Sequence, residues 1–189
     1  MTSDPTRHRD APRRQRTWHR LIAFTVLITT AALLPAPAAH AAASATCTGS
    51  SAISYSPGLT FTPQTVTYSE TDTLTSCTST VSGLTSGTSG TVFTLPGASC
   101  LAAPSLNTDP TFTITWNTGQ HSVINLTFTD LIVAGTEQVT GTGTVTSGPF
   151  TGGNATVVWV YPVLNPLQCL ASPGLTSQSG TLIAQLTLI

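Results

Sequence analysis

The segment from residue 111 to 130 carries the strongest folding signal in the chain. Six large apolar side chains, all at even-numbered positions, alternate with Thr, Asn and Val on two limbs: Phe112, Ile114, Trp116, Ile124, Leu126 and Phe128. A period of two is typical of a half-buried strand, so the segment predicts a β-hairpin. In an antiparallel pair of strands, the residue numbers of each facing pair add up to the same value. Two even-numbered sets therefore share a face only if the loop has an odd number of residues.

A three-residue loop, Asn117-Thr118-Gly119, meets this condition. Gly119 then occupies the third loop position, where a type I turn followed by a G1 bulge needs a positive φ that glycine adopts without steric cost. The predicted register places Trp116 opposite Gln120. Trp116 then shares its face with the other apolar side chains and is expected in the core.

The N-terminal segment 1–41 has the pattern of a secretory signal peptide. All six cationic side chains come first: Arg7, Arg9, Arg13, Arg14, Arg16 and Arg20. An apolar run at 21–34 follows, which is short for a membrane span, and then a region of small residues. We expect cleavage after Ala41, with Ala43 as the alternative, and a secreted, extracellular protein at 42–189.

The expected mature chain, 42–189, contains neither Lys nor Arg. Its acids are Glu70, Asp72, Asp109, Asp130 and Glu137. Nucleic-acid binding depends on cations that neutralise phosphates, and attraction to anionic lipid needs the same cations. We therefore expect neither nucleic acid nor, after signal cleavage, a membrane as partner. The length suits a single domain.

Four cysteines lie in the expected mature chain, namely Cys47, Cys77, Cys100 and Cys169. In an exported chain they predict two structural disulfides, for which three connectivities are possible. We favour Cys47 with Cys77, because the segment between them turns at Pro57-Gly58, and hence Cys100 with Cys169. The chain lacks a Cys-x-x-Cys spacing and His121 is its single mature histidine, so we expect no metal or cofactor.

Short predicted strands separated by turn residues fill the rest of the chain. They cover residues 46–55, 64–69, 73–80, 91–95, the two hairpin limbs, 138–147, 155–161 and 181–189. Residues 83–90 are expected to form a loop, and residues 164–176 a covering loop held by Cys169. Thr accounts for 32 of the mature residues, and its branched Cβ suits a pleated, half-exposed surface. This pattern predicts an antiparallel, immunoglobulin-like β-sandwich.

Three short motifs carry a resemblance. Residues 55–60 (Tyr-Ser-Pro-Gly-Leu-Thr), 116–119 (Trp-Asn-Thr-Gly) and 166–170 (Pro-Leu-Gln-Cys-Leu) accompany the Arg-rich export signal and the absence of Lys. Together they resemble the small secreted β-sandwich proteins of high-GC Gram-positive, actinobacterial type. The resemblance implies the compartment and the immunoglobulin-like fold, and it implies no activity.

Candidate catalytic and metal-binding groups are few. His121 follows the hairpin turn without an acid partner in the sequence, which indicates a solvated side chain rather than a catalytic base. Glu70 and Asp72 stand in a turn-like Ser-Glu-Thr-Asp string, and turn propensity explains all five acids. A calcium site at Glu70 and Asp72 is the alternative. We expect no enzyme.

Trp159 and Tyr161 lie on one face of their predicted strand and form the candidate ligand platform, although burial is the favoured interpretation. We expect a secreted, non-catalytic structural or binding protein, with a carbohydrate-binding module as the alternative. A small secreted enzyme, or an ice- or surface-binding protein built on the Thr-x-Thr runs at 111–115 and 140–146, is less favoured. Because no Lys protects the strand edges, a cell-surface polymer or a second copy of the chain is the expected kind of partner.

Overall fold

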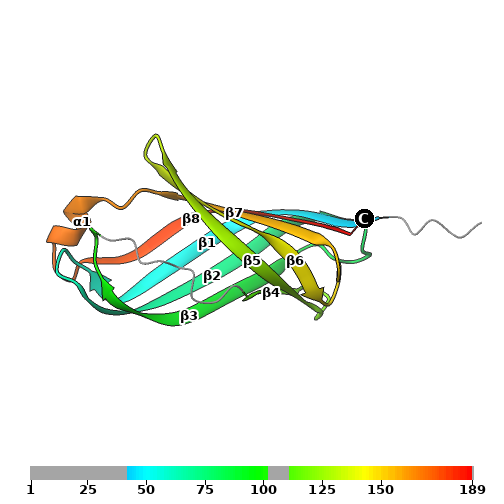
Figure 1. The fold of residues 1–189 in the computed structure, drawn as a ribbon, viewed down its shortest axis with the longest axis horizontal. Coiled ribbons are helices and arrows are strands. Elements are labelled where there is room, and N and C mark those ends of the chain that lie inside the picture. The colour runs from blue at the N-terminus through cyan, green and yellow to red at the C-terminus, as the bar shows by residue number, and fades with distance from the viewer. Residues whose placement is uncertain (1–41, 102–110, 189) are drawn as a thin grey trace, which may run out of the picture. The chain divides into compact units, whose positions relative to one another are not determined.

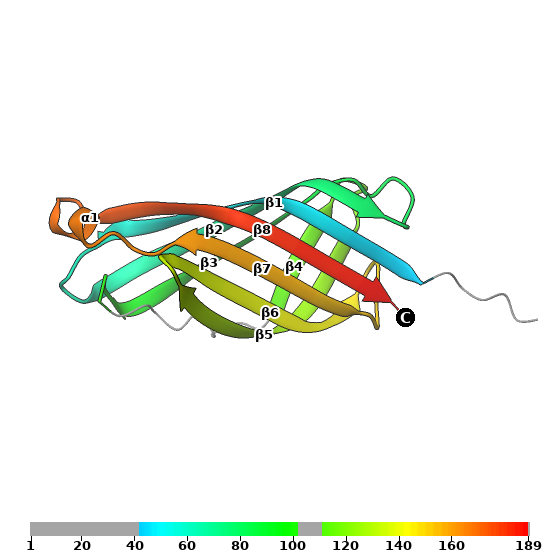
Figure 2. The same ribbon diagram turned by 90° about the horizontal axis from the view of Figure 1, so that it is seen from above.

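Eight antiparallel strands follow one another around a closed barrel in the computed structural model, which describes residues 42–101 and 111–188 (Figure 1). The elements are β1 (Ala43–Leu59), β2 (Gln64–Ser79), β3 (Gly87–Ala98), β4 (Thr111–Trp116), β5 (His121–Val133), β6 (Thr136–Ser147), β7 (Asn154–Pro162), α1 (Pro166–Leu170) and β8 (Leu175–Leu188). Each strand pairs with the next, and β8 pairs with β1 (Figure 2). The prediction of an all-β antiparallel fold is confirmed, but the immunoglobulin-like sandwich is wrong.

The pairing of the first strand with the last distinguishes the barrel from a sandwich. Continuous pairing runs from Ala43↔Leu188 to Ser54↔Ser177, so the two edge strands of the sheet hydrogen-bond to each other. A closed barrel needs long, tilted strands, and β1 and β2 have 17 and 16 residues. The partners of this pairing are far apart in sequence, and local alternation alone does not encode which strands meet.

Two predicted strand breaks are absent. The chain continues as β1 through Pro57, which lies between the last β1–β8 pair at Ser54 and the next at Leu59. Proline is tolerated at this position because the pairing does not require a backbone N–H donor there. The second predicted break, between residues 69 and 73, is also continuous strand: Glu70 pairs with Ile53 on one side and Thr91 on the other.

The hairpin of β4 and β5 has the predicted register. The Trp116 backbone N–H donates to the Gln120 carbonyl at 2.8 Å, and Ile114 faces Ser122. Gly119 has a φ of 78°, as the three-residue loop requires. Trp116 is 2% exposed and is a core residue.

Apolar side chains fill the barrel around Trp116. Its ring packs edge-on against Phe150 at a centroid distance of 6.2 Å. Its Nε1–H donates to Ser122 Oγ at 2.8 Å, and that hydroxyl donates to the Pro149 carbonyl at 2.9 Å. This part of the interior is packed, and the polar groups of Trp116 and Ser122 both have hydrogen-bond partners.

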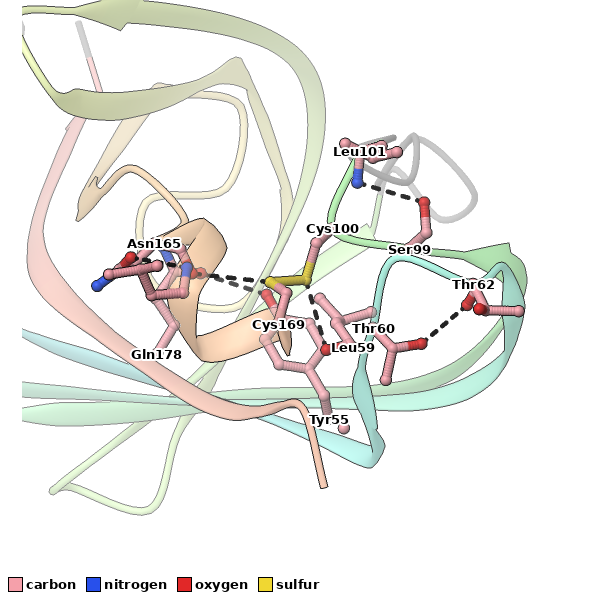
Figure 3. The surroundings of a disulfide bond; sticks show 12 residues. Tyr55, Leu59, Thr60, Thr62, Ser99, Cys100, Leu101, Asn165, Cys169 and Gln178 are labelled. Carbon is pink, nitrogen blue, oxygen red and sulfur yellow. Dashed lines mark hydrogen bonds between the residues drawn. A yellow bond between two sulfur atoms is a disulfide. The ribbon is translucent and has the colours of Figure 1, made fainter. Parts of the chain in front are cut away.

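Both predicted disulfides are confirmed. Cys47–Cys77 joins residues that face each other on β1 and β2. Cys100–Cys169 attaches the segment after β3 to α1, which lies at one end of the barrel (Figures 1 and 3). The predicted covering loop therefore contains α1, which Asn165 caps by accepting a hydrogen bond from the Leu167 N–H at 3.0 Å.

The predicted signal peptide, its cleavage after Ala41 and the acid Asp109 lie outside the described residues. Ala43, the alternative cleavage position, begins β1. Within the described part of the chain, no helix has the length and apolar character needed to cross a membrane.

Candidate functional site

A cavity of about 290 Å³ occupies the barrel interior beside the packed part. Six aromatic side chains line it: Tyr68, Phe93, Phe112, Phe128, Trp159 and Tyr161. They come from β2, β3, β4, β5 and β7, so strands from most of the barrel circumference contribute. Two carboxyl groups, those of Glu70 and Asp72, also line the cavity.

Strand alternation directs these side chains inward. On β2 the buried positions are Val66, Tyr68, Asp72 and Leu74, while the intervening threonines are exposed. On β7, Trp159 and Tyr161 lie on the buried face with Ala155 and Val157. Because successive side chains of a strand point to opposite faces, Glu70 also lies on the interior face of β2.

The aromatic rings form two groups. Tyr68 stacks on Phe93 at a centroid distance of 4.6 Å and an interplanar angle of 24°. Trp159 meets Phe112 edge-on at 5.4 Å and 89°, and Phe128 lies 6.1 Å from the same ring. These offset and edge-to-face contacts are the preferred aromatic geometries, so the wall is held without a ligand.

Each carboxyl group binds to a ring of the wall. Trp159 Nε1–H donates to Asp72 Oδ1 and Oδ2 at 3.2 and 3.3 Å. Glu70 Oε2 accepts from the Tyr68 hydroxyl at 2.8 Å, and Glu70 Oε1 accepts from the Tyr161 hydroxyl at 2.9 Å. Ser51 Oγ on β1 also donates to Glu70 Oε1, at 3.0 Å. The acids are therefore fixed in position by donors from three strands.

Burial dominates the electrostatics of the pair. Asp72 is 1% exposed, and desolvation, followed by the nearby charge of Glu70, raises its pKa to about 7. Burial also raises the pKa values of the Tyr68 and Tyr161 hydroxyls, with a second contribution from Glu70. Both hydroxyls consequently remain protonated and act as donors.

Between β3 and β4, the described residues leave the cavity open. In the described residues these strands pair at two positions, Gly87↔Trp116 and Thr88↔Thr115. Beyond that point the cavity lies between them, bordered by residues 89–91 of β3 and 111–113 of β4. We call this opening the seam. Phe93 and Phe112 are half-buried beside it, whereas Trp159 is 4% exposed.

The predicted ligand platform is present as a pair of neighbouring rings, but not as an exposed surface. Trp159 and Tyr161 are each 4% exposed and face the cavity. The structure thus brings them together with Glu70 and Asp72, which the sequence placed in a turn. The interpretation as a turn was wrong. The alternation of every second residue on β2 indicates a continuous strand through both acids: Val66, Tyr68, Glu70, Asp72 and Leu74.

The other candidate residues lie elsewhere. His121 is exposed, and its Nδ1 is 3.0 Å from Thr115 Oγ1 on the outside of the hairpin. Asp130 is exposed, and Glu137 is half-buried with a pKa raised by burial and by Asp130. Among the described residues, no group of three or more His, Cys, Asp or Glu side chains is placed to hold a metal ion.

No protein-family model, no curated protein and no solved structure matches the chain.

Proposed function

We propose that the chain is an exported, non-catalytic binding protein that holds one small, largely apolar molecule in the barrel cavity. The carrying observation is the cavity itself: about 290 Å³, lined by six aromatic side chains and open at the seam. Pockets for small molecules are concave and mostly apolar, with a few fixed polar groups. Eight-stranded barrels have the diameter that accommodates one small ligand.

Export is supported by two features. The sequence 1–41 has the order of a signal peptide, and the barrel carries two disulfides, which persist in oxidising compartments. Extracellular localisation is tested by N-terminal sequencing of the protein recovered from culture medium. A start at Ala42 supports export, and a chain that remains inside the cell with its first residues intact argues against it.

Carbohydrate binding, the alternative expected from sequence, has less support. A platform for a polysaccharide surface needs exposed coplanar rings, whereas Trp159 and Tyr161 lie inside the barrel. Retention of the wild-type protein on insoluble cellulose or chitin, abolished by Trp159→Ala without unfolding, would restore this alternative.

Acid–base catalysis is the second candidate function of the site. A carboxyl group with a pKa near 7 that lies beside a second carboxyl group is suited to proton transfer. Glu70 and Asp72, however, lie two residues apart on one strand. Glycoside hydrolysis needs carboxyls on opposite sides of the scissile bond. The oxygens of both acids also already accept hydrogen bonds from the cavity wall, which supports a binding role.

The test uses N-phenyl-1-naphthylamine, a neutral apolar dye whose fluorescence rises when it leaves water. We expect saturable binding of one dye per barrel. Thr91→Trp adds a large ring at the seam and should weaken binding at least about tenfold, because it occupies the entrance. Val92→Trp is the matched control, since Val92 is 68% exposed on the opposite face of the same strand.

The near-UV circular dichroism of each variant verifies folding. Absence of saturable dye binding by the wild type, or equal binding by Thr91→Trp and Val92→Trp, would contradict the proposed function.

A further inference from the structure

The cavity contains acidic groups that no cation of the folded chain balances. Residues 42–189 include neither Lys nor Arg, and their single histidine, His121, lies outside the barrel. Asp72 is 1% exposed, and Glu70 is partly buried beside it. A buried carboxylate is ordinarily paired with a cation because desolvation of an unpaired charge is costly. Here the hydrogen bonds come from neutral donors alone.

The aromatic rings around the two acids are also suited to binding a cation. The face of an aromatic ring is electronegative, and Trp and Tyr attract cations placed over them. In this cavity six aromatic side chains surround the two acids, and three of them, Tyr68, Trp159 and Tyr161, bind the carboxyl groups through their polar ends. Aromatic cages combined with nearby negative charge are suited to ammonium groups with apolar substituents.

A metal ion fits less well. Ca²⁺ takes six to eight oxygen ligands, and no group of three or more acidic, His or Cys side chains occurs in the part of the chain that the structure describes. An organic cation needs fewer oxygens and gains from the apolar walls.

We propose that the cavity binds an organic ammonium cation, with Glu70 and Asp72 as its counter-charges and the aromatic side chains as its cage. This inference rests on the proposed binding function and defines the ligand class. The cation enters through the seam. Its charge compensates the pair, and its substituents contact Phe93, Phe112 and Phe128.

Ligand charge and shape are separated by a matched pair of competitors. Phenyltrimethylammonium and tert-butylbenzene have nearly the same shape and differ by one positive charge. Each is used to displace N-phenyl-1-naphthylamine from the wild-type protein at pH 8. We expect the cation to displace the dye at a concentration at least about tenfold lower than the neutral hydrocarbon.

The charge dependence is then assigned to residues. Glu70→Gln and Asp72→Asn, alone and together, keep the side-chain shape and remove charge, so the preference for the cation should disappear while the dye still binds. Asp130→Asn is the control, because this exposed acid lies outside the cavity lining. It should leave the preference unchanged.

A pH series on the wild type provides the same information without substitution. Two titratable groups lie near Asp72, namely Glu70 on β2 and Tyr161 on β7. Glu70 in turn lies near Tyr55 on β1 and Tyr68 on β2. Ser51 on β1 also faces the acids and is neutral. The tyrosines keep their protons because burial raises the pKa values of their hydroxyls, so the change of charge near pH 7 comes from Asp72. The cation preference should increase as the pH rises through about 7.

The outcomes distinguish the two proposals. If the dye does not bind, the binding function itself fails. If the dye binds but tert-butylbenzene competes as well as phenyltrimethylammonium, the cavity is a neutral apolar site and the ammonium inference fails alone. A cation preference that survives the double substitution and does not change with pH would also overturn the inference.

Discussion

Trp159 Nε1–H donates to both carboxyl oxygens of Asp72, at 3.2 and 3.3 Å, although the two residues are separated by 87 positions in the sequence. Their strands, β7 and β2, are not neighbours in the barrel, so this contact crosses the interior. It joins an aromatic side chain of the cavity wall to Asp72, the most deeply buried of the acids that the structure describes. The contact therefore couples the stability of the barrel to the ionisation of Asp72.

Trp159→Phe should lower the free energy of unfolding more at pH 8 than at pH 5. A hydrogen bond to an ionised group contributes about 1.5–3 kcal/mol and a neutral one about 0.5–1.5 kcal/mol, so we expect a difference of about 1 kcal/mol between the two pH values. Urea unfolding at both pH values measures it. In Trp116→Phe the lost partner is Ser122, which does not titrate, so equal losses are expected there. Equal losses in Trp159→Phe would contradict this prediction.

The unliganded wild-type protein should lose stability as the pH rises from about 4 to about 7. In this window the folded state retains the Asp72 proton, because its pKa is raised to about 7, whereas the unfolded state has released it. The unfolded state thus binds fewer protons, and the free energy of unfolding falls by up to about 1.4 kcal/mol per pH unit. Above pH 7 this contribution is constant.

Asp72→Asn removes most of that dependence and should be more stable than the wild type at pH 8. Glu137, whose pKa is raised in the same direction, leaves a smaller residual slope. Thermal unfolding between pH 4.5 and 8 supplies the comparison. A wild-type stability that increases across this range would show that Asp72 is not buried as described.

Asn117→Ala should destabilise the protein by about 1.5–4.5 kcal/mol, since three hydrogen bonds are lost. The Asn117 side chain accepts from the backbone N–H groups of Thr85 and Ser86 at 3.0 and 3.2 Å, and donates to the Gly83 carbonyl at 2.8 Å. It thereby fixes the β4–β5 turn to the β2–β3 connection, and each bond contributes about 0.5–1.5 kcal/mol. Chemical denaturation tests this prediction by comparing Asn117→Ala with Thr118→Ala. Thr118 is an exposed neighbour, and its replacement should change the free energy of unfolding by no more than about 0.5 kcal/mol. Similar values for the two variants would be inconsistent with it.

Replacing Cys100 and Cys169 together by Ser should lower the free energy of unfolding by about 4 kcal/mol, the loop-entropy estimate for a bridge that closes 69 residues. It should also expose residues 163–174 to proteolysis, because the bridge attaches α1 to the segment after β3. The matching variant, with Cys47 and Cys77 replaced by Ser, should keep α1 protected. Equal proteolysis of α1 in both variants would argue against this role of the Cys100–Cys169 bridge.

Local sequence patterns predicted the hairpin and the disulfides. Position parity in residues 111–130 determined the loop length, since an even-numbered set on both limbs leaves little freedom of register. The same reasoning placed Trp116 in the core. The hairpin and the position of Trp116 depend on neighbours that are close in sequence, whereas the disulfides join cysteines 30 and 69 positions apart.

The barrel and its site depend on contacts that local patterns do not encode. Closure results from the pairing of β1 with β8, which the strand pattern alone does not distinguish from sandwich packing. Glu70 and Asp72 were assigned to a turn because acids are common there. Their burial becomes understandable only when Tyr161 and Trp159 approach from β7 with hydrogen-bond donors.

The central claim, that a ligand enters the cavity beside Trp159, is tested most directly by NMR. The domain has two tryptophans, Trp159 in the cavity wall and Trp116 in the packed interior, so two indole Nε1–H resonances report on the two places separately. Titration with phenyltrimethylammonium at pH 8 should shift the Trp159 resonance saturably, with one ligand per barrel, and leave the Trp116 resonance in place. Two resonances that do not move, or that move equally without saturation, would contradict the account.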